Sequence, residues 1–132
     1  MVLVDTSVWI DFFAGRDLPH VERLGDLINK GEDLCVCGVI LAEVLQGIRE
    51  EREYRKTKAY LEDLIYLDLP RKVYLEAASI YRSLRAGGLT IRNTVDCLIA
   101  AACIEHDAIL LHNDRDFDAI SRRFPLQTGM GK

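Results

Sequence analysis

The chain has 132 residues, enough for about one domain with a buried core and too few for two catalytic domains. Hydrophobic residues make up 49% and charged residues 29%, a balance typical of globular proteins rather than of disordered or fibrous ones. No apolar run approaches the roughly 20 residues that a membrane helix needs. Asp5 and Asp11 interrupt the apolar N-terminus, so we expect no signal peptide and a cytoplasmic location.

The net charge of −4 comes from 17 basic and 21 acidic residues. Taken alone, it argues mildly against a nucleic-acid partner, because phosphate-binding surfaces are usually basic. If five of the acids were gathered in one metal pocket, however, the remaining charges would nearly balance. The net charge therefore excludes neither RNA nor DNA as a substrate.

Short apolar runs alternate with segments of helical periodicity along the chain. Strands are expected at residues 2–4, 34–37, 108–111 and 124–126, the last at a sheet edge because it contains Pro125. Helices are expected over residues 8–13, 21–28, 40–48, 73–84, 97–104 and 117–120. This alternation predicts an α/β fold with three layers (α/β/α) around a central parallel sheet of four or five strands.

A dense mixture of charges occupies residues 49–58. Its first interpretation is a solvated helix face with ion pairs four residues apart. The alternative is a patch that contacts phosphates, formed by Arg49, Arg52, Arg55, Lys56 and Lys58.

The four cysteines lie in apolar segments, as Cys35, Cys37, Cys97 and Cys103. Zinc ligands usually come in closely spaced pairs on loops. We therefore expect these thiols to be buried apolar groups and not metal ligands.

Five acidic residues stand at element ends or beside apolar stripes: Asp5, Glu43, Asp96, Asp114 and Asp116. Ligands of parallel sheets bind beyond the carboxyl ends of the strands, and two of these acids follow strands. Gathered carboxylates repel one another and raise each other's pKa, which a divalent cation relieves. Oxygen ligands suit Mg²⁺ or Mn²⁺. Each acid alone is also explained as a helix cap, a turn residue or an exposed side chain.

Four sequence blocks carry a resemblance to a known family. They are VDTSVWI at residues 4–10, LAEVLQG at 41–47, TVDCLIAA at 94–101 and LHNDRDF at 111–117. In this order and spacing they resemble the PIN-domain ribonucleases, and among them the VapC-type toxins of toxin–antitoxin pairs. The resemblance covers essentially the whole chain and implies a single PIN domain over residues 1–132 with a PIN-like fold.

The resemblance implies a metal-dependent active site. Its catalytic quartet would be Asp5, Glu43, Asp96 and Asp114, holding one or two Mg²⁺ or Mn²⁺ ions. Asp116 matches a frequent additional metal-binding acid, and Ser7 matches a hydroxyl residue that supports the site. At position 112, where many relatives have Thr or Ser, this chain has His112, which we expect to point into solvent.

The implied activity is endonucleolytic cleavage of RNA, inhibiting translation through tRNA or rRNA. Candidate RNA contacts are Trp9, Tyr54, Arg82, Arg85, Arg92 and Arg115, although Trp9 is also explained as a core residue. The implied partners are a VapB-type antitoxin and a second copy of the chain, in a homodimer or a larger assembly with the antitoxin. Apolar residues among 8–13 and around Tyr60, Leu61 and Leu64 would suit an antitoxin groove, and the alternative is that they belong to the core.

Two alternative functions remain at this point. A PIN-like fold without its metal would be a catalytically silent binding module. A phosphotransferase that forms an aspartyl phosphate also begins with an acid at a strand end, but it normally has a second acid two residues later, where this chain has Ser7.

Overall fold

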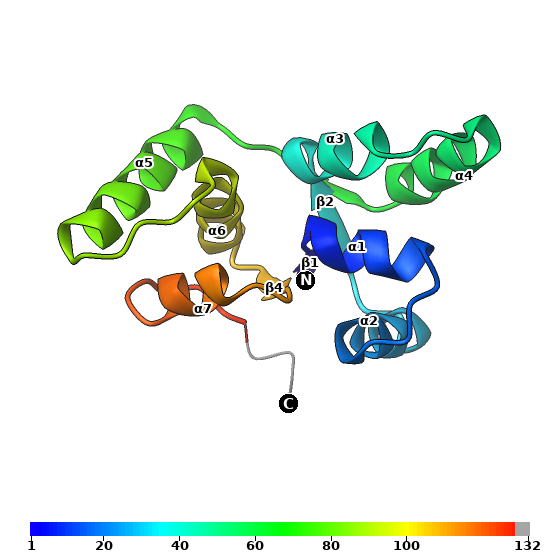
Figure 1. The fold of residues 1–132 in the computed structure, drawn as a ribbon, viewed down its shortest axis with the longest axis horizontal. Coiled ribbons are helices and arrows are strands. Elements are labelled where there is room, and N and C mark those ends of the chain that lie inside the picture. The colour runs from blue at the N-terminus through cyan, green and yellow to red at the C-terminus, as the bar shows by residue number, and fades with distance from the viewer. Residues whose placement is uncertain (129–132) are drawn as a thin grey trace.

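The computed structural model describes residues 1–128, and its centre is a parallel sheet of four strands in the order β3-β2-β1-β4. Figure 1 labels β1, β2 and β4 at the centre of the molecule, between the helices. The strands are β1 (Val2–Val4), β2 (Leu34–Cys37), β3 (Ile65–Leu67) and β4 (Ile109–Leu111). Leu3 is in register with Cys35 on one side and with Leu110 on the other. Residues 129–132, which the single-domain prediction includes, lie outside the described residues.

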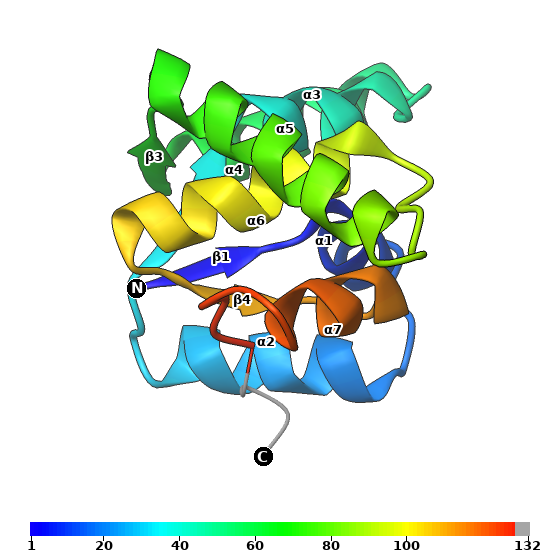
Figure 2. The ribbon, with the colours of Figure 1, turned by 90° about the vertical axis from the view of Figure 1, so that its left-hand side faces the viewer.

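Seven helices surround the sheet within residues 1–128. They are α1 (Thr6–Phe13), α2 (Pro19–Asn29), α3 (Gly38–Gln46), α4 (Glu51–Glu62), α5 (Arg71–Ala86), α6 (Thr94–His106) and α7 (Arg115–Ser121). Figure 2 shows β1 and β4 between α5 and α6 on one side and α2 on the other. The predicted three-layer α/β/α architecture with four parallel strands is confirmed.

Helix α6 is the most buried helix of the core. All seven residues from Cys97 to Cys103 are buried, as expected for a helix that is apolar on every face. The strands β1 and β2 are buried along their whole length, because helices cover parallel strands on both faces.

The predicted burial of the four thiols is confirmed, because all four cysteines are buried and form no disulfide. Burial raises the pKa of Cys35 to about 12 and, with nearby carboxylates adding to it, that of Cys97 to about 11. These groups therefore stay neutral and behave as small apolar side chains.

Two sheet predictions were wrong. Strand β3 was missed, because it has only three residues and its first two, Ile65 and Tyr66, are exposed at the sheet edge. Residues 124–126 form no strand; instead Gln127 pairs with Ile109 in an isolated bridge. Pro125 has no N–H to donate to a neighbouring strand.

The charged segment folds as predicted into an exposed helix, α4, with an Arg55–Glu51 ion pair at 3.5 Å. Within residues 1–128, no helix combines the length and hydropathy required to cross a bilayer.

Candidate active site

The sheet brings the first and last acidic blocks together. Asp5 directly follows β1 and Asp114 comes three residues after the end of β4. These strands are neighbours, and the Asp5 N–H donates to the Leu111 carbonyl at 2.9 Å. Both acids therefore lie at the same edge of the sheet, as the strand pattern predicts.

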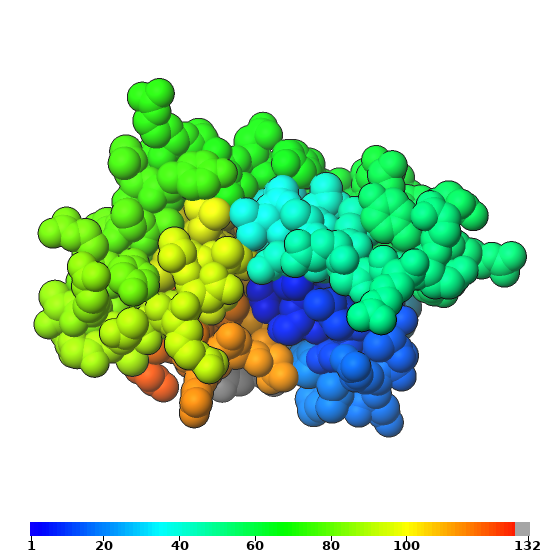
Figure 3. Space-filling model, turned by 45° about the horizontal axis from the view of Figure 1, so that its top comes forward, coloured from blue at the N-terminus to red at the C-terminus, as the bar shows by residue number. Residues whose placement is uncertain are grey.

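Helix α6 supplies the third acid from its first turn. Asn93 is the N-cap, because its side-chain oxygen accepts a hydrogen bond from the Val95 N–H at 2.9 Å. This start places Asp96 in the first turn, where a carboxylate complements the helix dipole. The space-filling view shows α6 (yellow), the β4–α7 segment (orange), α1 (blue) and α3 (cyan) meeting on one face of the molecule (Figure 3).

Asp114 and Asp116 are oriented by the start of α7. Asp114 is the N-cap, and its Oδ1 accepts a hydrogen bond from the Asp116 N–H at 2.9 Å. One carboxylate oxygen each of Asp96, Asp114 and Asp116 lies within 4.8 Å of the others, an arrangement that could hold a metal ion. We call these three residues the carboxylate triad.

Asp5 and Glu43 lie beside the triad but outside that 4.8 Å group. Asp5 is buried, and its Oδ2 accepts a hydrogen bond from the Ser7 hydroxyl at 2.9 Å. Glu43, half-buried on α3, accepts a hydrogen bond from the Thr6 hydroxyl at 2.7 Å. Thr6 was not predicted as a site residue, and its only signal in the sequence is its place directly after Asp5 at the start of a helix.

The electrostatics show that all five predicted acids face one region. The pKa of Asp96 is raised to about 7, first by burial and then by the charges of Asp114, Asp5, Asp116 and Glu43. Burial also raises the pKa of Asp5, against the opposing effect of the Ser7 hydrogen bond. Without a cation, this cluster holds its negative charge at a cost in free energy.

The donor chemistry fits a hard divalent cation. The triad offers only carboxylate oxygens, which are ligands for Mg²⁺ or Mn²⁺, whereas zinc sites normally contain His or Cys. The nearest thiol in the sequence, Cys97, is buried and protonated.

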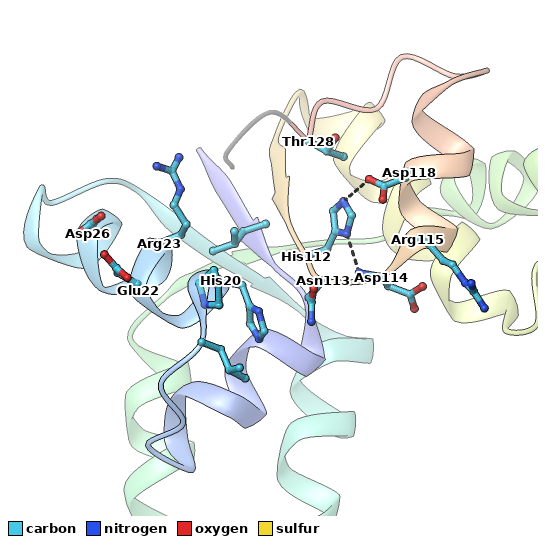
Figure 4. Close-up of a pocket in the computed structure, with 13 residues that line it drawn as sticks. His20, Glu22, Arg23, Asp26, His112, Asn113, Asp114, Arg115, Asp118 and Thr128 are labelled. Carbon is cyan, nitrogen blue, oxygen red and sulfur yellow. Dashed lines mark hydrogen bonds and ion pairs between the residues drawn. The ribbon is translucent and has the colours of Figure 1, made fainter. Parts of the chain in front are cut away.

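The expectation that His112 points into solvent was wrong. Its side chain is only 9% exposed, and its ring packs against Phe117 with centroids 5.0 Å apart. Nδ1 accepts a hydrogen bond from the Asp114 N–H at 3.0 Å, and Nε2 lies 3.6 Å from Asp118 Oδ1 (Figure 4). Burial lowers the pKa of His112, which favours the neutral ring with its proton on Nε2. His112 directly follows β4, and two residues of α7, Phe117 and Asp118, lie against its ring.

Trp9 is a core residue and not a surface for RNA. It is fully buried, stacks on Phe13 at 5.6 Å and meets Phe12 and Tyr60 edge to face. The arginines among the candidate contacts, Arg82, Arg85, Arg92 and Arg115, are exposed, and Tyr54 is half-buried.

A cavity of about 860 Å³ adjoins the triad. It lies between α2 and the β4–α7 segment, and Asp114 forms part of its wall (Figure 4). A smaller apolar groove of about 280 Å³ lies between α1, α3 and α4.

Comparison with known proteins identifies the family. The sequence pattern of the PIN domain matches residues 2–123. The chain belongs to the PIN domain family. Within this family it is 35% identical to ribonuclease VapC11 of Mycobacterium tuberculosis over 129 residues, 96% of each chain. It is also 27% identical to ribonuclease VapC1 of Methanocaldococcus jannaschii over 121 residues, which is 90% of this chain and 80% of that one.

Solved PIN domain structures have the same fold. VapBC2 of Rickettsia felis, bound to a DNA fragment from its promoter, matches with a TM-score of 0.76 at 21% identity, covering 97% of both chains. VapBC-1 of nontypeable Haemophilus influenzae matches with a TM-score of 0.75 at 24% identity over the whole of both chains. The resemblance to VapC-type PIN domains is thus confirmed.

Proposed function

We propose that this VapC-type PIN domain is an endoribonuclease, the toxin of a toxin–antitoxin pair. The convergence of the triad carries this proposal, because the chain belongs to the PIN domain family and is 35% identical to a protein named as a ribonuclease. The VapC matches favour neither the silent binding module nor the phosphotransferase. By analogy with the family, we propose that cleavage of tRNA or rRNA inhibits translation.

Activity is proposed to depend on Mg²⁺ or Mn²⁺. Asp96, Asp114 and Asp116 would hold the ion, with Asp5 and Glu43 binding it, or a second ion, directly or through water. When bound, such an ion lowers the pKa of a coordinated water and neutralises charge on the phosphate.

The chain's own groups prepare the site for this chemistry. The Ser7 hydroxyl stabilises the ionised form of the buried Asp5 carboxyl, and Thr6 fixes one oxygen of Glu43. The exposed guanidinium groups of Arg92, four residues before Asp96, and Arg115, next to Asp114, would contact RNA phosphates.

The test is cleavage of total RNA and of a fluorogenic RNA strand with Mn²⁺, Mg²⁺ or chelator. We expect metal-dependent cleavage that is lost in Asp96→Asn and retained in Asp17→Asn, a matched change at an exposed acid outside the site. Cleavage in chelator, or full activity of folded Asp96→Asn, would contradict the proposal. A folded protein with no cleavage and no Mn²⁺ binding that depends on Asp96 would instead indicate the silent binding module.

A VapB-type antitoxin is proposed to occupy the apolar groove. Ile10, Phe13, Val44 and Ile48 line this groove, and Ile10 is 43% exposed. The structural neighbours include VapBC and FitAB assemblies. An apolar antitoxin segment would cover these side chains, burying apolar area from water.

The groove proposal is tested by co-purification with a co-expressed candidate antitoxin. Ile10→Asp, which places a charge in the groove, is expected to abolish the complex, and Leu89→Asp, at an exposed apolar residue outside the groove and outside β3 and α5, is the matched control. Equal recovery of the complex with Ile10→Asp would place the antitoxin elsewhere.

We also propose that the chain forms a homodimer, and larger assemblies with the antitoxin. Half of the eight exposed large apolar side chains in the described chain belong to β3 and α5: Ile65, Tyr66, Tyr74 and Leu75. Light scattering of the purified chain tests this proposal, and a monomer mass at all concentrations would contradict it.

A further inference from the structure

We propose that the cavity between α2 and the β4–α7 segment binds an unpaired nucleobase of the RNA strand, next to the cleaved bond. This inference rests on the proposed ribonuclease function, because the occupant is part of the same substrate. The cavity volume of about 860 Å³ falls within the usual range of ligand-binding cavities.

The position of the cavity links it to the reacting phosphate. Asp114 belongs both to the carboxylate triad and to the cavity wall. An RNA strand with one phosphate at the triad therefore has its adjacent nucleotide at the mouth of this cavity. Leu111, the last residue of β4, also lines the cavity.

The charge of the lining argues for a base and against a series of phosphates. Two guanidinium groups and four carboxylates line the cavity: Arg23, Arg115, Glu22, Asp26, Asp114 and Asp118. This excess of negative charge would repel phosphates, whereas both signs together suit a neutral group with donors and acceptors at its edge. Nucleobases are such groups, and RNA is usually recognised through bases that are not paired.

The remaining lining supplies surfaces for the faces of a planar ring. Pro19 is apolar and exposed and offers a surface to the face of a base, whereas Leu111 and His112 are only 4% and 9% exposed. The His20 ring is held in place by a 2.6 Å contact between its Nε2 and Asp11 Oδ2. A wall fixed in this way loses little conformational freedom when a ligand binds.

Arg23 is available to a base in the cavity. Among residues 1–128 no ion pair engages Arg23, and its buried Nε has no hydrogen-bond partner there. A guanidinium group donates well to the carbonyl and ring-nitrogen acceptors of a base. Figure 4 shows Arg23 on α2 across the cavity from His112 and Asp118.

The experiment is a titration of the isotope-labelled full chain in EDTA, followed by backbone amide chemical shifts. The probes are the four nucleoside 5′-monophosphates, with ribose 5-phosphate as the compound that lacks a base. We expect at least one nucleotide to shift amides in 18–26 and 111–118, and ribose 5-phosphate to shift none of them. Arg23→Gln should weaken this binding by about tenfold, while Arg71→Gln, at the exposed start of α5, should leave it unchanged.

The outcomes separate this inference from the proposed function, because binding is measured without metal and cleavage with it. Equal shifts with ribose 5-phosphate, or shifts confined to the groove of α1, α3 and α4, would overturn the inference. If Arg23→Gln does not fold, Asn113→Ala in the exposed cavity wall replaces it, and unchanged affinity would count against the inference. Metal-dependent RNA cleavage with no nucleotide bound in the cavity would overturn the inference alone. Nucleotide binding in the cavity by a chain that cleaves no RNA would overturn the proposed function alone.

Discussion

Helix α6 carries two neighbouring ionisable groups whose pKa values burial raises in the same direction, with different consequences. In its first turn, burial and four neighbouring acids raise the pKa of Asp96 to about 7. In the next residue, burial raises the pKa of the Cys97 thiol to about 11. The carboxyl group therefore titrates near neutral pH, while the thiol stays protonated and inert.

The two parts of α6 contribute to folding stability with opposite sign. The core around residues 97–103 contributes stability through apolar burial. The carboxylate triad reduces stability, because like charges are held together at partial burial. Functional sites commonly contain such destabilising groups, because the chemistry needs charges that the fold alone would not favour.

The largest expected effect concerns the acidic end of α6. Asp96→Asn should lower the rate of RNA cleavage by at least about 1,000-fold, equivalent to about 4 kcal/mol of transition-state stabilisation. The reason is the loss of one charged ligand from the triad. Initial rates in Mn²⁺ measure this effect, with Asp17→Asn as the control. A loss of less than tenfold would show that Asp96 is not part of the reacting centre.

Substitutions in the buried apolar part of α6, residues 97–103, should change the free energy of unfolding and not the rate of RNA cleavage. Ile99→Ala removes a side chain that is 1% exposed and should lower the free energy of unfolding by about 2–5 kcal/mol. Ile99→Val is the graded control, with an expected loss of about 0.5–1.5 kcal/mol. Urea unfolding measures both. Equal effects of the two variants would show that this part of the core is not close-packed.

The pH dependence of the free energy of unfolding, measured on the metal-free protein, tests the raised pKa of Asp96 at the start of α6. The pKa of Asp96 in the folded protein, about 7, lies above the ordinary value of 3.8 for an aspartate, so the folded state binds this proton more tightly. The free energy of unfolding should therefore fall as the pH rises from about 4 through about 7. At pH 8 in EDTA, Asp96→Asn should be more stable than the wild type by roughly 1–2 kcal/mol, after allowing for solvent screening of a half-buried group. Urea midpoints at several pH values test this, and a less stable variant at pH 8 would contradict it.

His112 should affect metal binding as a positioning residue. His112→Leu removes the acceptor for the Asp114 N–H and should weaken Mn²⁺ binding by about five- to tenfold. His112→Asn restores an acceptor at the same distance along the side chain and should stay within about twofold of the wild type. Equal affinities of both variants would show that this hydrogen bond does not orient Asp114.

The smallest effect is expected from a thiol reagent. The four buried cysteines should not react in the folded protein and should react fully in urea. Absorbance after addition of an aromatic disulfide measures this. Rapid reaction of one thiol in the folded state would show that the core opens locally.

The sequence was most informative where a residue's environment follows from its neighbours along the chain. The apolar runs at Val2–Val4 and Leu34–Cys37 are strands, and the periodic stripe from Val73 to Leu84 lies in α5. The five acids were predicted as site residues because their blocks resemble those of PIN domains in order and spacing. Their mutual approach follows from the pairing of β1 with β4.

The features that were missed depend on contacts between distant segments. Strand β3 is short and half-exposed, so its pairing with β2 is what makes it a strand. The burial of His112 depends on its packing against Phe117, which lies on the helix after the turn. The Thr6–Glu43 hydrogen bond joins residues that are 37 positions apart, so no local sequence pattern predicts it.

The most direct test of the central claim is Mn²⁺ binding, measured by the loss of the free-ion paramagnetic resonance signal. The wild-type chain should bind Mn²⁺ saturably, and Asp96→Asn should bind it at least about tenfold more weakly, since even supporting groups around a metal change affinity that much. Asp17→Asn should match the wild type. No saturable binding by the folded wild type, or equal binding by Asp96→Asn, would contradict the assignment of the triad as a metal centre.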